Sequence, residues 1–309
     1  MAYTDREDLN YLGKLYMIGA NQTPFLNMIG GLTGGGKISN SFNFPIAQPW
    51  ALRAADQTTA VKSEATSITD VTELTYARDQ DINTCQIMKY PYGVSFAKQS
   101  TFGEIGGISI LGNPPVTDEL AFQRMAALRQ MAVDLEFSFL QGEYVANNLA
   151  STVAKTKGML EACVSNTVDG NVAALSKALI KELLLEMAAS GALFQNMVLF
   201  CGGYQKQAIS DLYGYAPEDR LVGGVNVQSI YTDFAQIGVV YDPYMPADDI
   251  LIADMSVISP VFCPYQGQII VDQEVAMTTA KRGGFLYTQV GLDFGPEEFH
   301  GSLTNLKDS

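Results

Sequence analysis

The sequence has little charge and few of the residues that commonly do chemistry. Only 17% of its 309 residues are charged, there is one histidine and one tryptophan, and the four cysteines lie far apart. No cysteine pair has the close spacing of a zinc site, so we expect no metal. No apolar run reaches the ~18–20 residues of a membrane span, and residues 1–8 are too polar for a signal peptide. We expect a soluble protein that folds in a reducing cytoplasm and does not contact a membrane.

Basic residues are also scarce. The chain has 19 Lys and Arg against 33 Asp and Glu, a formal net charge of -14. Binding to the phosphates of nucleic acid needs clustered Lys and Arg, and no such cluster is present. The imbalance is largest in residues 207–280, where Arg220 is the only basic residue. The acidic surface either aids solubility or keeps the protein from adhering to a nearby polyanion.

Motifs for catalysis and cofactor binding are incomplete. Residues 31–37 match G-x-x-x-x-G-K of the P-loop, but Ile38 stands where a Ser or Thr would bind Mg²⁺. The chain has one imidazole, His300, and no G-x-S-x-G motif that would supply the nucleophilic serine of a hydrolase. Acidic pairs occur at a helix start or in proline-containing loops and turns, where structural roles are common. We therefore expect no enzyme and no cofactor. The pairs are Asp118-Glu119, Glu218-Asp219, Asp248-Asp249 and Glu297-Glu298.

The first 36 residues have the pattern of an arm. A short helical pattern ends near Asn21, and a second short helix is predicted from Thr23 to Ile29, with Pro24 at its first position. Glycines follow it. Two short apolar helices cannot bury their faces on each other, so we expect the arm to dock elsewhere.

Residues 37–98 have strand-like patterns on both sides of a polar stretch. Pro45 and Pro49 exclude a long helix, and residues 54–70 are polar and rich in Thr and Ala. Loops longer than ~12–15 residues are usually functional or docked on a partner. We expect a strand, a long mobile tip and a returning strand.

The strongest helical pattern runs from about residue 117 to 149. Thr117 or Asp118 can cap it, and Gly142 is a point where it could bend or end. At ~1.5 Å per residue the helix would be roughly 50 Å long, which predicts an elongated molecule. Its expected apolar stripe is Ala121, Met125, Leu128, Ala132, Leu135 and Phe139.

The second half of the chain alternates between helices and strands, which indicates a small α/β lobe followed by more strands. The predicted helices are 171–189 and 204–212, the strands 197–201, 225–235, 238–241, 249–253, 266–279 and 285–294, and a hairpin turn is predicted at 281–284. The four cysteines have apolar neighbours, so we expect them to be buried thiols.

This order of parts resembles the Hong Kong 97-type major capsid proteins of tailed bacteriophages. Residues 23–30, T-P-F-L-N-M-I-G, are similar to a T-P-F-L-x-x-I-G segment of one subgroup long catalogued as phage proteins of unknown function. Residues 42–54, with Trp50, resemble the entry to the extended loop of that group, and residues 93–98 resemble the return strand. Residues 290–303 are similar to its closing strand and turn.

The resemblance implies an α+β fold, the Hong Kong 97-like major capsid fold. It assigns an N-terminal arm to residues 1–36, an extended β-hairpin loop to 37–90, and a peripheral domain to 91–154 and 259–289, with a spine helix at about 117–149. The axial domain would be 155–258 and 290–309. The arm and the loop would bury their apolar residues only on neighbouring subunits.

The same resemblance implies the function of a major capsid protein. Copies would form hexamers and pentamers of an icosahedral phage head around double-stranded DNA, after assembly in the host bacterial cytoplasm. Partners would include a portal protein and, where the phage uses them, separate scaffolding or decoration proteins. The candidate assembly residues are Phe25, Leu26, Met28, Ile29, Trp50 and Lys62. Lys62 lies where some family members crosslink a lysine to an asparagine, but no matching Asn or Glu is found, so no crosslink is predicted.

Three alternatives stay open at this point. An encapsulin-like compartment shell shares the fold but holds an enzyme cargo. A soluble hydrolase would use an acidic pair such as Asp248-Asp249. An α+β binding domain would be a monomer in solution.

Overall fold

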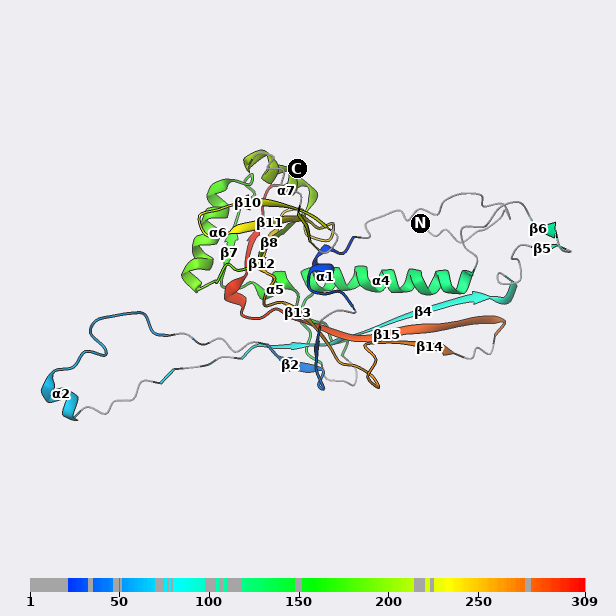
Figure 1. Cartoon of the computed structure of the whole chain (residues 1–309), viewed down its shortest axis with the longest axis horizontal. Helices are drawn as coiled ribbons and strands as arrows, with labels where there is room; N and C mark the ends of the chain where they lie inside the picture. The colour runs from blue at the N-terminus through cyan, green and yellow to red at the C-terminus, as the bar shows by residue number, and fades with distance from the viewer. Residues whose placement is uncertain are drawn as a thin grey trace.

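The protein is elongated, with two large sheets, one long helix and a loop that projects far from these sheets (Figure 1). The computed structural model describes residues 22–32, 36–46, 50, 52–69, 75–76, 78, 80–97, 104–105, 108–109, 118–147, 152–213, 220–222, 225–275 and 279–308. The helical pattern expected before Asn21 lies outside these residues, as does the acidic pair Glu218-Asp219.

A five-stranded sheet carries the long helix α4 (Glu119–Gln141), which runs along it in Figure 1. Strand β15 is the centre of this sheet because it pairs antiparallel with three others, β4, β13 and β14. The short β1 adds to β13 in parallel. The strands are β1 (Lys37–Ile38), β4 (Gln86–Ser95), β13 (Ser259–Phe262), β14 (Ile270–Val275) and β15 (Lys281–Asp293).

Polar side chains of α4 fix the helix on this sheet. The Tyr90 hydroxyl on β4 donates to Oδ2 of Asp134 on α4 at 2.5 Å. The Tyr92 hydroxyl donates to Asp272 on β14, and Arg124 of α4 forms a salt bridge with the same carboxylate. Hydrogen bonds to charged groups are stronger than neutral ones, so these contacts set the position of α4 over the strands.

The helix α4 is shorter than the sequence pattern predicts. Asp118 caps its start, with its side chain accepting from the backbone N–H groups of Leu120 and Ala121, and the helix stops at Gln141. Gly142 is extended, and a Cβ there would overlap the carbonyl oxygens of Ser138 and Thr156. The chain therefore turns away at Gly142 to pack against residues 156–158. At ~1.5 Å per residue the helix is about 35 Å long instead of the expected 50 Å.

The expected apolar stripe of α4 is only half buried. Leu135 and Phe139, near the C-terminal end, are fully buried, whereas Met125 and Leu128 are exposed. The sheet covers only one side of the N-terminal half, where Leu120 is buried instead. The first half of the predicted stripe therefore points away from the chain's own core.

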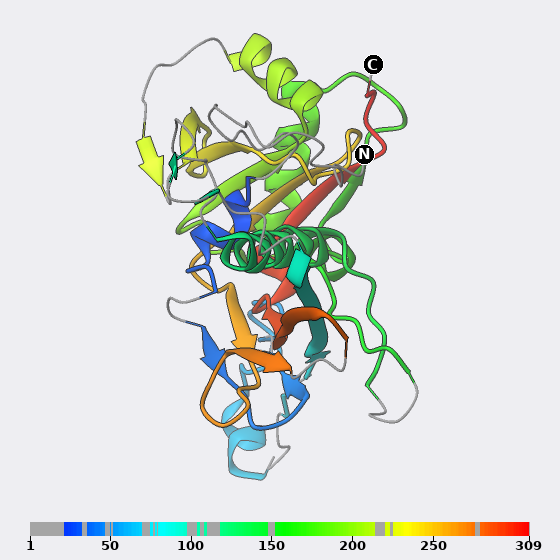
Figure 2. The same ribbon diagram turned by 90° about the vertical axis from the view of Figure 1, so that its right-hand side faces the viewer.

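A seven-stranded mixed sheet forms the lobe at the other side of α4. Figure 2 looks along α4, with this lobe above the helix and the five-stranded sheet below it. Strands β8 and β12 are buried at every residue, so the lobe has a hydrophobic core of its own. In spatial order the strands are β7 (Thr167–Asp169), β16 (Gly301–Thr304), β12 (Ile250–Asp254), β8 (Met197–Cys201), β11 (Gln236–Tyr241), β10 (Val225–Tyr231) and β9 (Arg220–Val222).

The lobe's two main helices are α6 (Lys177–Ser190) and α7 (Gly203–Tyr213). The predicted strand at 197–201 and the helix at 204–212 are confirmed. The predicted helix at 171–189 begins later, because Asn171 and Val172 have left-handed φ angles and Ser176 is the N-cap, accepting from the N–H of Leu179.

The projecting loop leaves the body through a small hairpin. Strand β2 (Asn43–Pro45) pairs with β3 (Ile82–Thr84), and Trp50 forms an isolated bridge with Arg78 farther out. Near the tip lies a short helix, α2 (Glu64–Thr69), although the sequence predicts only a long mobile tip there.

The remaining short elements lie outside this loop. A further hairpin joins β5 (Glu104–Ile105) to β6 (Ile108–Ser109). The other short elements are α1 (Pro24–Met28), α5 (Met159–Ala162) and the 3-10 helix η1 (Glu297–Phe299).

The hairpin turn predicted at 281–284 is wrong, because these residues lie inside β15, paired with β4 and, at Gly283 and Gly284, with β14. A Cβ on Gly283 would overlap the Tyr92 carbonyl oxygen, and one on Gly284 would overlap that of Gln273. These glycines permit close strand packing rather than a turn. Strand β15 also continues to Asp293, so the division expected at residue 290 falls inside a strand.

Candidate functional site

The described residues hold no group of three or more His, Cys, Asp or Glu side chains able to bind a metal ion. His300 is fully buried: its Nε2–H donates to the Phe294 carbonyl at 2.6 Å, and its Nδ1 accepts from the Asp254 N–H at 3.2 Å. Burial lowers the pKa of this imidazole. Both ring nitrogens are therefore used in holding two loops together, which is a structural role.

The acidic pairs in the described residues have structural partners. Asp118 caps α4. Glu297 accepts from the backbone of Val164 and Ser165, and Oδ1 of Asp249 accepts from the Asn305 N–H. These carboxylates hold loops and the C-terminal segment in place.

The near-match to a P-loop has the wrong structural context. Lys37 and Ile38 lie in β1, so a strand follows the glycines where a P-loop requires a helix. The Lys37 ammonium forms a salt bridge with Asp293, and a Cβ on Gly36 would overlap the Phe262 ring. Lys37 therefore pairs with a neighbouring strand, and Gly36 allows the close approach of the Phe262 ring.

The cysteines agree with the expectation of buried thiols, with one partial exception. Cys85, Cys163 and Cys201 are buried free thiols, and Cys263 is half-buried. Burial raises the pKa of the first three to about 12, which makes them unreactive at neutral pH.

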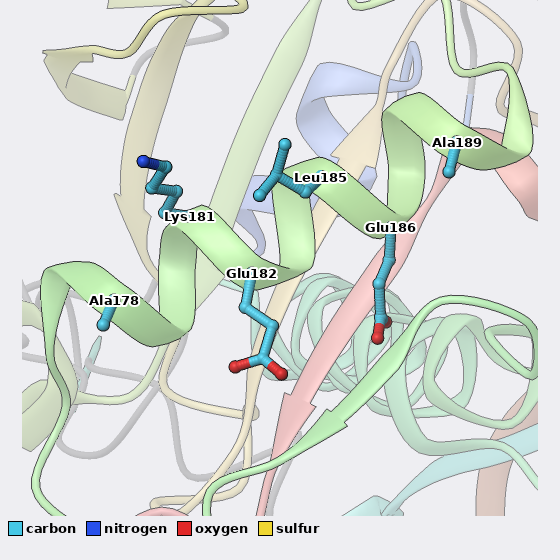
Figure 3. Close-up of a pocket in the computed structure, with 6 residues that line it drawn as sticks. All are labelled: Ala178, Lys181, Glu182, Leu185, Glu186 and Ala189. Atoms are coloured by element: carbon cyan, nitrogen blue, oxygen red, sulfur yellow. The ribbon is translucent and has the colours of Figure 1, made fainter.

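A shallow depression on the outer face of α6 is lined only by side chains of this helix (Figure 3). Leu185 is half exposed at its centre, and the carboxylates of Glu182 and Glu186 point away from the helix. None of the six residues that line it is a buried polar group, so it is an ordinary amphipathic helix surface.

The arm helix α1 is buried in the chain's own core. Phe25 and Leu26 are 0% and 2% exposed, and Ile29 is also buried. The Phe25 ring meets Phe200 of the lobe edge-on, with 5.3 Å between ring centroids. The expectation that these side chains bury only on neighbouring subunits is therefore wrong: α1 fits between α4 and the lobe, where its apolar face finds cover within the chain. Met28 packs there as well, but it is only half-buried.

Glu136 of α4 binds the first turn of α1. Its two carboxyl oxygens accept from the backbone N–H groups of Phe25 and Leu26, each at 2.7 Å. The first N–H groups of a helix have no partner within the helix, so a buried α1 needs such an acceptor. The sequence contained one signal of this role, because Glu136 interrupts an apolar face formed by Ala132, Phe139 and Leu140.

Asp242, directly after β11, is the second carboxyl group at this junction. Both side chains are fully buried, and they lie close enough to affect each other's ionisation. Burial and repulsion from Asp242 raise the pKa of Glu136, and burial raises the pKa of Asp242 as well. Two adjacent buried carboxyl groups cannot both ionise, so the pair holds one proton at neutral pH.

The projecting loop exposes apolar side chains. Trp50 is 61% exposed and Ile68 is 78% exposed, and α2 has no buried residue at all. Lys62 lies in the same loop, also exposed. Exposed apolar side chains on a projecting loop are available for contact with another molecule. The loop's exposed large apolar side chains are Trp50, Leu52, Val61 and Ile68.

The described helices include none that is long and apolar enough to cross a membrane.

Comparison with known proteins identifies the fold. The family model for the SU10 major capsid protein matches residues 2–307. The structure is similar to the capsid asymmetric unit of cyanophage A-1(L), with a TM-score of 0.64 and 12% identity over 99% of both chains. It is also similar to the capsid of a native GTA particle, with a TM-score of 0.60 and 13% identity over 96% of this chain and 94% of the other.

One similar structure comes from another functional class. The holo-SrpI encapsulin complex of Synechococcus elongatus PCC 7942 matches with a TM-score of 0.53 and 11% identity, over 94% of this chain and 92% of that chain. No curated protein sequence matches the chain. At these low identities the structural similarities identify the fold, which is the Hong Kong 97-like α+β fold expected from the sequence.

Proposed function

The chain belongs to the SU10 major capsid protein family, and from that premise we propose that its copies assemble as hexamers and pentamers into an icosahedral phage head around double-stranded DNA. A major capsid protein is a component of the virion. Assembly takes place in the host bacterial cytoplasm, together with a portal protein and any separate scaffolding or decoration proteins. The role is structural, without catalysis.

The observation that carries this proposal is the projecting loop. The large apolar side chains of its described residues are mostly exposed in the monomer, and α2 lies far from both large sheets (Figure 1). Burying apolar surface contributes about 25 cal/mol per Å². A loop that finds this cover only on a neighbouring subunit makes folding and assembly cooperative. Trp50 and Lys62 belong to this loop contact.

The proposed domain division follows the two sheets. The seven-stranded lobe is the axial domain, and the five-stranded sheet with α4 is the peripheral domain. The loop between β2 and β3 is the extended loop, and residues 1–36 are the arm. With β15 assigned to the peripheral domain, the last part of the axial domain begins after Asp293.

The charge of the chain suits a container for DNA. A net charge of -14 leaves few lysines and arginines to bind phosphate, so packed DNA is enclosed without a strong hold on the shell.

A substitution at Ile68 tests the proposal. Ile68→Asp places a charge on a surface that must become buried in the shell, so assembly should be lost. The subunit itself should stay folded, because the side chain is 78% exposed. Ile68→Val is the matched control and should assemble normally. Sedimentation of the purified proteins measures this, and an Ile68→Asp protein that still forms wild-type particles would contradict the loop's role.

The second candidate function is an encapsulin-like compartment, supported by the similarity to the encapsulin complex. The content of purified particles distinguishes the two: DNA favours the phage head, and a packaged enzyme favours the compartment. A hydrolase using Asp248 and Asp249 is disfavoured, since Asp249 already holds the Asn305 backbone.

A further inference from the structure

The buried pair formed by Glu136 and Asp242 joins three separate parts of the chain. Glu136 comes from α4, Asp242 follows β11 of the lobe, and the N–H groups bound by Glu136 belong to α1. Oδ1 of Asp242 accepts from the Tyr244 N–H at 2.9 Å. Its Oδ2 receives no hydrogen bond from an N–H group or a hydroxyl of the described residues, which leaves this oxygen to hold or accept the shared proton.

No cation neutralises the pair within the described part of the chain. The salt bridges recorded there involve neither carboxyl group, and α1 has no titratable side chain. On α4 the charged residue closest to Glu136 in sequence is Asp134, whose carboxylate accepts from the hydroxyl of Tyr90.

The lobe contributes other titratable groups to the same junction. Tyr244 lies close to both carboxyl groups, and Tyr241 lies beside Tyr244. The thiol of Cys201 is near Asp242, and Lys206 acts on this thiol while its ammonium donates to the Val239 carbonyl at 2.6 Å. The groups around the two carboxyls are therefore acids or neutral groups, apart from Lys206, whose ammonium is bound to the Val239 carbonyl. A single proton shared by Glu136 and Asp242 would neutralise one of their charges when α1 covers them.

We propose that Glu136 and Asp242 form a proton-dependent latch for the arm, in which uptake of one buried proton accompanies the docking of α1 between α4 and the lobe. When α1 leaves, water reaches the pair and both groups ionise at neutral pH. When α1 returns, the carboxyl pair is again sealed from water and must take up a proton. The device goes beyond the proposed capsid function and does not depend on it.

Two glycines with left-handed φ angles end α1. Gly30 and Gly31 follow the helix with φ angles of 104° and 65°, a left-handed conformation that favours glycine. A Cβ added at Gly31 would meet no other atom, so this glycine is not required for packing. The turn after α1 therefore depends on glycine for its backbone conformation, and the Gly31 N–H donates to the Leu26 carbonyl at 2.7 Å.

The proposal sets the size and the sign of the pH effect. If docking takes up one proton, the ratio of docked to undocked α1 changes about tenfold per pH unit, and docking weakens as the pH rises. Between pH 6 and pH 8 the ratio should fall by about 100-fold.

Hydrogen exchange of the full-length protein measures this ratio. Exchange in a peptide spanning residues 22–31, corrected for the intrinsic effect of pH, gives the opening equilibrium of α1. A peptide spanning β8 serves as internal reference for global unfolding. Protection of α1 should fall about 100-fold from pH 6 to pH 8, relative to the reference.

Two variants separate the latch from a simple packing role. Glu136→Gln accepts from one N–H of α1 and donates its amide to Asp242, so it needs no shared proton. Asp242→Asn serves the same purpose from the lobe side if the first variant folds poorly. Both should remove the pH dependence of α1 protection, whatever they do to its absolute value.

Asp134→Asn is the matched control, because it removes a carboxylate from the same helix but leaves α1 untouched, and it should keep the wild-type pH dependence. Wild-type protection that does not change with pH would overturn the latch. So would a Glu136→Gln protein whose protection still changes tenfold per pH unit.

Discussion

Truncation of Phe25 to alanine tests whether α1 is part of the subunit's own core. The side chain is 0% exposed and meets Phe200 edge-on at 5.3 Å. Phe→Ala in a packed core costs about 3–5 kcal/mol, and the lost aromatic pair accounts for about 0.5–1.5 kcal/mol of such an effect. Because a domain's total stability is about 5–15 kcal/mol, this single change should be severe.

The assay is denaturant unfolding of the unassembled subunit, in the Ile68→Asp background so that assembly does not add to stability. The control is Asn27→Ala, which changes an exposed residue of the same helix and should alter the free energy of unfolding by less than about 0.5 kcal/mol. A Phe25→Ala subunit that loses less than about 1 kcal/mol would refute the reasoning and return α1 to the role of an arm covered only by neighbours.

Three further predictions concern the rest of the fold. Burial lowers the pKa of His300 from its ordinary 6.5, so its neutral form contributes stability that is present above about pH 6.5 and is lost as the pH falls, by up to about 1.4 kcal/mol per unit. His300→Gln should lack this loss. The measurement is the free energy of unfolding against pH, compared between the variant and the wild type. The comparison is needed because the Glu136–Asp242 pair lowers stability as the pH rises. Gly283→Ala should lower the free energy of unfolding by about 1–3 kcal/mol, because its Cβ would overlap the Tyr92 carbonyl oxygen. The control is Gly203→Ala, whose Cβ would lie 3.6 Å from the Tyr241 ring and should be nearly neutral. Thermal unfolding measures both variants. Asp118→Ala removes the N-cap of α4 and should cost about 0.5–2 kcal/mol by thermal unfolding; an unchanged stability would show that α4 does not need the cap.

The elements that the sequence predicts well are those whose signals are local. The continuous apolar run at 197–201 is β8, and the pattern at 204–212 is α7. The cap at Asp118 is also local, since its side chain reaches only the next turn. The fold class was indicated by the resemblance of the order of arm, loop, spine helix and lobe to Hong Kong 97-type capsid proteins.

The errors concern features that depend on distant parts of the chain. The sequence marks Gly142 only as a point where α4 could end, whereas the structure ends the helix there, with Gly142 packed against the carbonyls of Ser138 and Thr156. The place of Phe25 depends on Phe200, 175 positions away. Glycines at 283 and 284 resemble a turn in sequence, but the close approach of β4 and β14 is what requires them.

The carboxyl pair was missed for the same reason. Glu136 alone is a glutamate in a helix, and Asp242 alone follows a strand. Their joint effect exists only once α4 and the lobe are packed together. An acidic residue on an apolar helix face is the one signal of such a pair in the sequence, and it identifies only one of the two partners.

Electron microscopy of the purified full-length protein tests the central claim most directly. The account predicts closed shells of hexamers and pentamers for the wild type and dispersed, folded subunits for Ile68→Asp. A wild-type protein that stays monomeric under every assembly condition, with the loop between Trp50 and Arg78 as exposed as in the isolated subunit, would contradict it.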